Sequence, residues 1–136
     1  MSSVMVALVT KLKADSTLMA LVTNVFDGIA PDSATYPFLV IDRVGAAGDE
    51  YTLTRRVRTS YLFIIKVISE GYSVLVAETA LARVDILLTD STLDVTSQTT
   101  IYMRRQRSYQ LDEVAANGRV FKHRGYEWQV EQREDA

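Results

Sequence analysis

TRRVRTSYLFIIKVI, residues 54–68, decides the fold, because it has the longest strand pattern in the sequence. Residues of like parity face the same side of a β-sheet. Here both parities carry apolar side chains: Val57, Tyr61, Phe63, Ile65 and Val67 on one, and Leu62, Ile64 and Ile68 on the other. The pattern predicts a long strand whose second half is covered on both faces.

A helix is expected directly after this strand. Gly71 ends the strand, and apolar residues then recur at steps of three and four over residues 72–88. They form one stripe made of Val74, Ala77, Leu81, Val84 and Leu88. This spacing predicts one long amphipathic helix that packs on the sheet.

Two further strands are expected at residues 99–111 and 119–131. The pair Asn117-Gly118 lies between them, and both residues tolerate positive φ, which makes the pair a strong hairpin signal. In the last strand Trp128 shares a parity with Tyr126 and Val130. We expect Trp128 to anchor the sheet to a helix.

The N-terminal part combines two helices with short strands. Helical spacing places Met5, Leu8, Val9 and Leu12 on one face of a first helix, and Asp15 offers an N-cap for a short helix over residues 16–22. Val25-Phe26 is better interpreted as a strand or turn, and Pro37 suits the first position of a strand that continues to Ile41. Residues 45–50 are expected to form a flexible loop.

These elements predict a single α+β domain over residues 1–136. The expected fold is a mostly antiparallel β-sheet with an N-terminal helix and one long amphipathic helix packed on one face. No internal repeat, linker or low-complexity tract divides the chain.

Composition limits the function. The chain has 136 residues, no cysteine and a net charge of -2, which gives no global reason to expect nucleic acid or a membrane as partner. No apolar run approaches the roughly 20 residues of a membrane span, and no targeting segment is convincing. We therefore expect a chain without a membrane partner.

An enzyme is not expected. The single histidine, His123, lies between Lys122 and Arg124 and is interpreted as a solvated strand residue. No nucleophile elbow, phosphate-binding glycine loop or carboxylate-rich metal loop occurs, so no catalytic residue, cofactor or metal is predicted. A two-carboxylate site is the last of the alternatives.

Arginine is concentrated in two places: residues 55, 56 and 58, and residues 104, 105 and 107. If the two strands are neighbours, these side chains form a band across one end of the sheet. The band is either a solvated face that protects a sheet edge, or a contact with acidic subunits or DNA, since the guanidinium pairs with carboxylate and phosphate alike.

The order of elements resembles the siphophage tail-completion or tail-terminator proteins over nearly the whole chain. The residues that carry the resemblance are Val25-Phe26-Asp27-Gly28, Ala30-Pro31 and Tyr36-Pro37-Phe38-Leu39-Val40-Ile41, followed by the strand at 61–68 and the helix at 72–88. The arginine-rich stretch at 103–107 departs from that family.

The resemblance implies a virion subunit of a ring, usually hexameric, at the head-proximal end of a long tail. Such a ring ends polymerisation of the tail tube protein and joins the head connector, with DNA nearby in its lumen. It would assemble in the host cytoplasm. The alternatives are a head-completion or connector subunit of the neck and, less favoured, a small nucleic-acid-binding module.

The interface hypothesis names ten residues. They are Gly45, Gly48, Asp49, Glu50, Arg55, Arg56, Arg58, Arg104, Arg105 and Arg107. Strand edges and loops are natural ring contacts, because a partner can add hydrogen bonds to an open edge. Residues 45–54 are predicted to be poorly ordered in the free subunit.

Overall fold

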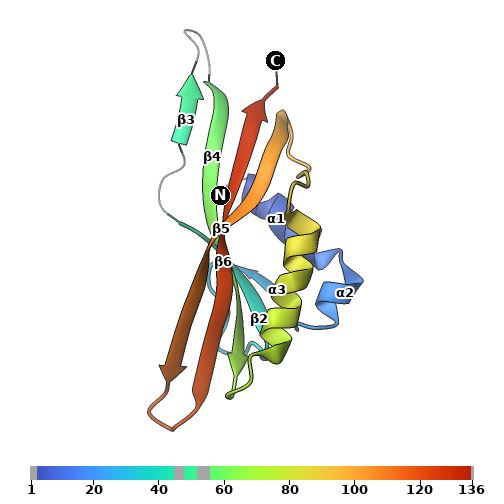
Figure 1. Ribbon diagram of the computed structural model, residues 1–136. Coiled ribbons are helices and arrows are strands. Elements are labelled where there is room, and N and C mark those ends of the chain that lie inside the picture. Colours follow the sequence, from blue (N-terminus) through green and yellow to red (C-terminus); the bar gives the residue numbers. More distant parts are fainter. Residues whose placement is uncertain (1–2, 45–47, 52–55, 136) are drawn as a thin grey trace.

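Three helices cover one face of a β-sheet in the computed structural model of the chain (Figure 1), which describes residues 3–44, 48–51 and 56–135. The helices are α1 (Ser3–Lys13), α2 (Ser16–Met19) and α3 (Leu75–Leu88). The strands are β1 (Val25–Asp27), β2 (Phe38–Arg43), β3 (Gly48–Tyr51), β4 (Arg56–Glu70), β5 (Gln98–Val114) and β6 (Val120–Glu134). An α+β fold dominated by its sheet is therefore confirmed.

The strand order in the described part of the sheet is β1-β2-β4-β6-β5. Neighbouring strands are antiparallel except β1 and β2, which are parallel. The short strand β3 pairs with the start of β4, on the same side of β4 as β2. The sheet is thus mostly antiparallel, as predicted, with β5 at one edge and β1 and β3 at the other.

The core lies between the sheet and the helices. Phe63, Ile65 and Val67 of β4 are fully buried on the helix side, together with Trp128 of β6. The expected anchoring role of Trp128 is therefore confirmed. The other parity of β4, Leu62, Ile64 and Ile68, is half-buried, so the face away from the helices is covered only in part.

The N-terminal elements follow the sequence prediction closely. Asp15 caps α2, because its Oδ2 accepts a hydrogen bond from the Leu18 N–H at 2.8 Å. However, α2 ends at Met19 instead of continuing to residue 22. Residues 25–27 form β1, so the short Val25-Phe26 piece is a strand.

The long helix differs from its prediction. It begins at Leu75 instead of Tyr72, so Tyr72 and Ser73 lie before the first helical turn. Ala77, Leu81, Val84 and Leu88 are buried as expected, but the outer face carries Leu75 and Ile86, which are 70% and 71% exposed. A single long helix with one apolar face is therefore not confirmed.

The loop predicted at residues 45–50 is partly wrong. Residues 48–51 form β3 with a register shift between Glu50 and Tyr51, while residues 45–47 and 52–55 lie outside the described part. The poor order predicted for 45–54 therefore remains a prediction for most of that segment. In the described ranges no helix is long and apolar enough to cross a membrane.

Candidate assembly surface

The first part of the β5 edge is covered by the connection between α3 and β5. The Asp90 N–H donates to the Met103 carbonyl at 2.9 Å, and the Leu93 N–H donates to Thr100 Oγ1 at 2.9 Å. Leu93 and Val95 of this connection are buried. The cover ends at Met103.

Beyond Met103, the edge from Arg104 to Val114 pairs only with β6 among the described residues. We call the outward side of this stretch the open edge. In antiparallel strands every second residue directs its N–H and C=O away from the partner. The Ala115 N–H donates to the Arg119 carbonyl, so this pair of residues is hydrogen-bonded and the pair before it is not. Every second residue before Ala115 therefore directs its N–H and C=O outward: Ser108, Gln110, Asp112 and Val114. The open edge therefore offers a row of backbone donors and acceptors.

Three predicted arginines mark the start of the open edge. Arg104 contacts Asp90 at 3.1 Å and lies over the Tyr102 ring, and Arg105 lies 3.6 Å from Asp85 and over the Tyr126 ring. Arg107 donates to both carboxylate oxygens of Glu127 at 3.0 Å, which raises the pKa of its guanidinium. Their side chains remain 45–78% exposed, so each stays accessible to a partner.

The two arginine groups do not form one band. The condition for a band was that β4 and β5 be neighbours, but β6 lies between them. Arg58 is level with Arg133 of β6, whereas Arg104 and Arg105 are level with Gln129 and Trp128. Arg56 contacts Glu134 at 2.9 Å, and Arg55 and Gly45 lie outside the described residues.

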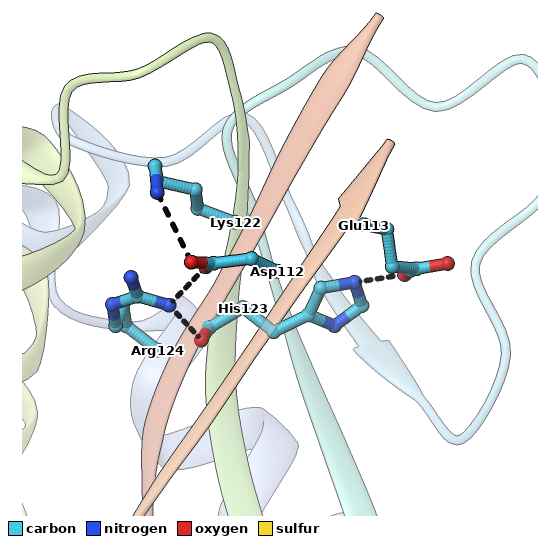
Figure 2. Close-up of polar contacts among 5 residues, drawn as sticks. All are labelled: Asp112, Glu113, Lys122, His123 and Arg124. Carbon is cyan, nitrogen blue, oxygen red and sulfur yellow. Dashed lines mark hydrogen bonds and ion pairs between the residues drawn. The ribbon is translucent and has the colours of Figure 1, made fainter. Parts of the chain in front are cut away.

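A polar cluster fixes the lower part of β5 to β6 (Figure 2). Asp112 accepts hydrogen bonds from Arg124 at 2.7 Å and Lys122 at 3.2 Å, and these two bonds lower the pKa of its carboxyl. Glu113 contacts Nε2 of His123. Because these pairs cross from one strand to the other, the open edge is held in its extended shape before any partner arrives.

His123 contradicts its predicted exposure. The side chain is 7% exposed, since it lies on the sheet face away from the helices, between Ile68 of β4 and Leu111 of β5. Burial, followed by the charge of Lys66, lowers the pKa of His123, and its Nδ1 is buried without a hydrogen-bond partner. A neutral histidine that donates through Nε2 to Glu113 fits these contacts.

The opposite side of the sheet has a second edge. Residues 48–51 of β3 pair with β4 alone among the described residues, and this strand contains the predicted Gly48, Asp49 and Glu50. The structure therefore places Gly48, Asp49 and Glu50 on one edge strand and Arg104, Arg105 and Arg107 on the opposite one, with Arg56 and Arg58 on β4 between them.

The described ranges contain no cluster of metal-ligating side chains. No group of three or more His, Asp or Glu side chains there could hold a metal ion. A groove of about 740 Å³ lies between α1 and the connection that covers β5; its charged lining residues are Lys11 and Asp94. Lys11 donates to the Thr92 carbonyl at 3.1 Å across this groove, and so joins α1 to the connection.

Sequence reasoning missed the connection that covers β5 and the polar cluster around Asp112. The cover depends on Asp90, whose φ of 52° turns the chain back onto the edge, and no sequence pattern indicates this. The cluster had a usable signal: Lys122 and Arg124 share a parity, and an Asn-Gly hairpin places an acid of the preceding strand opposite them.

Comparison with known proteins gives one family match. The family model described as tail completion protein gp17 matches residues 6–123. A solved structure described as the virion of a native gene transfer agent particle is 22% identical over 93% of each chain, with a TM-score of 0.70, so the two share a fold. A second solved structure is 11% identical over 96% of each chain, with a TM-score of 0.48, and carries no argument. No curated protein matches the chain in sequence.

Proposed function

The chain belongs to the family of tail completion protein gp17, and from this premise we propose that its subunits close into a ring at the head-proximal end of a long phage tail. The ring ends polymerisation of the tail tube and presents the surface that joins the head. Its partners are other copies of the chain, the tail tube protein and the connector proteins of the neck.

The open edge of β5 carries this proposal. A closed ring needs heterologous contacts, in which two different surfaces of the subunit meet. An unpaired edge recognises a second strand through its backbone, and side chains beside it add specificity. The stretch from Arg104 to Val114 supplies such an edge, and it lies on the opposite side of the sheet from β3.

The covered part of β5 supports the same conclusion. Exposed edges promote uncontrolled pairing, and proteins protect them with loops, charges or short strands. Here the connection from α3 protects residues up to Met103, while the remaining eleven residues are left to charge alone. A long unprotected edge is expected where a subunit uses that edge in an assembly.

A six-membered ring in the virion is the expected assembly, formed in the host cytoplasm. Arg104 and Arg107 lie on the sheet face away from the helices, opposite Gln129 and beside Glu127. If that face lines the lumen, these arginines lie close to the passing DNA. The function requires no cofactor and no catalytic residue.

The test is the mass of the purified protein by light scattering, alone and with its tail tube protein. A closed oligomer, or one that appears on mixing and stops tube growth, would support the proposal. A monomer that ignores the tube protein would contradict it and favour a connector subunit of the neck.

A further inference from the structure

We propose that β3 of one copy pairs with the open edge of the next copy, with Glu50 opposite Arg104 and Asp49 opposite Arg105. The inference rests on the ring proposed above and names the strand that completes it. It joins the two groups of predicted interface residues, which a single subunit keeps apart.

The directions of the strands suit this pairing. β3 and β6 are both antiparallel to β4, and β5 is antiparallel to β6, so β3 and β5 run in opposite directions. Rotation about a ring axis preserves the sense of each strand along that axis. The rotated copy therefore brings β3 to the open edge as an antiparallel neighbour, which is the favourable arrangement for two bare edges.

The faces agree as well. Position 49 is in register with Thr59 of β4, and Thr59 is in register with Gln132 of β6. Gln132 lies on the same face of β6 as Trp128, and Trp128 is the register partner of Arg105, so positions 49 and 105 share a face. Position 50 falls on the other face, where Arg104 is opposite Gln129. A continued sheet therefore puts positions 49 and 105 on one face and positions 50 and 104 on the other.

The offset along the strands is also suitable. Asp49 is level with Gln132, and Arg105 is level with Trp128, four residues or about 14 Å further along β6. Four strand spacings, about 19 Å, separate β3 of one copy from β3 of the next. The pairing thus tilts the strands by roughly 35°, within the range of about 35–45° that closed barrels need.

Charge favours the same partner. Arg104 gives one hydrogen bond to Asp90, and Arg105 lies 3.6 Å from Asp85, so both guanidinium groups keep unused donors. In the ring an acidic strand would lie between Arg58 of its own β4 and the arginines of the next β5. This arrangement explains why both strands that would flank β3 are rich in arginine.

Engineered cysteines test the pairing cleanly, because the chain has none of its own. The variants combine Glu50→Cys with Arg104→Cys, and Asp49→Cys with Arg105→Cys, within one chain. Opposite edges of a subunit are too far apart for an internal disulfide, so a bond must join two copies. Mild oxidation of the assembled protein should give a ladder of covalent oligomers on non-reducing gels.

The matched control is Glu50→Cys with Leu111→Cys, which places the second thiol lower on the same edge. It should give no ladder. A closed ring by light scattering without a ladder from either test pair would overturn the pairing while leaving the proposed ring intact. Absence of any ring, with or without tube protein, would overturn both.

Charge reversal gives an independent readout. Glu50→Lys should weaken assembly about tenfold or more, and Arg104→Glu added to it should restore most of the loss. Melting of the free subunit separates this result from misfolding, and the side chain of Arg104 is 60% exposed. Equal assembly of Glu50→Lys and the wild type would contradict the inference.

Discussion

Arg83 of α3 clamps the carboxylate of Asp15, donating from Nε to Oδ2 at 2.9 Å and from Nη2 to Oδ1 at 2.8 Å. The same carboxylate accepts the Leu18 N–H and so caps α2. The side chain of Asp15 thus caps α2 and joins it to α3. The hydrogen bonds from Arg83, then that from Leu18, lower the pKa of Asp15 to about 2.

The low pKa of Asp15 makes its contribution depend on pH. The pKa in the unfolded chain is near 3.8, so the ionised form stabilises the fold fully above that pH and loses its effect as the pH falls toward 2. Asp15→Asn keeps a capping oxygen but removes the charge. Its melting temperature should be several degrees lower at pH 7, and the difference from the wild type should vanish near pH 2. A difference that stays constant with pH would contradict the assignment.

Gly125 of β6 has no room for a side chain. A Cβ there would lie 2.3 Å from the Ile65 carbonyl oxygen and 2.6 Å from Lys66 Cα, and both neighbours are backbone atoms that cannot move alone. Gly125→Ala should therefore cost about 3 kcal/mol of stability in urea unfolding. Gly28→Ala is the matched control for removal of a glycine, because its Cβ meets nothing within 4 Å although its φ of +79° adds some strain. A larger loss for the control would contradict the steric argument.

The strand pattern of the sequence predicted β4, β5, β6 and their hairpin, because side-chain parity and an Asn-Gly turn are local signals. The residue type of Asp15 likewise predicted the cap of α2. The strand pattern placed residues 48–51 in a loop, since a four-residue strand with one glycine and two acids has low β-propensity, and pairing with β4 overrides that preference. Strand order is not local, so the position of β6 between the arginine strands could not be foreseen.

The same limit applies to the candidate site. The six arginines were identified from their clustering in two short stretches of the sequence. Which of them meet acids depends on tertiary structure, because Arg104 meets Asp90 of the connection and Arg107 meets Glu127 of β6. His123 was misplaced because its neighbours in the chain are charged, whereas Ile68 and Leu111, its neighbours across the strands, are apolar. Its exposure was therefore misjudged.

His123 should make stability sensitive to mild acid. Its pKa is lowered by burial and by Lys66, so the neutral form stabilises the fold fully above the unfolded value of 6.5. As the pH falls below 6.5, this contribution is lost. His123→Leu should remove that dependence, so the wild type should lose more stability than the variant between pH 7 and 5 in urea unfolding. Parallel losses would show that His123 takes no part.

Three exposed arginines should matter to assembly more than to folding. Exposed ion pairs typically contribute about 0–1 kcal/mol each, and the side chains of Arg104, Arg105 and Arg107 are all substantially exposed. Replacing all three by Ser should weaken assembly and leave the melting of the free subunit nearly unchanged. Lys13→Ser, Arg43→Ser and Arg133→Ser together provide a control of equal charge change away from the open edge. Normal assembly of the triple arginine variant would show that these side chains are merely solvated.

The backbone of the open edge can be tested one donor at a time. Gln110 points its N–H outward, opposite the non-hydrogen-bonded partner Arg124, so proline at this position removes a donor from the edge and none from the β5–β6 ladder. Because the proposed pairing sets β3 opposite residues 103–106, Gln110→Pro should melt within a few degrees of the wild type and still form a ring in light scattering. Gln110→Thr, which keeps the N–H and favours a strand, should assemble normally. Leu111→Pro removes an inward N–H and should unfold the hairpin, which verifies the phase of the strand. If Gln110→Pro fails to form a ring while Gln110→Thr assembles, the added strand extends to position 110 and the register proposed above is too short.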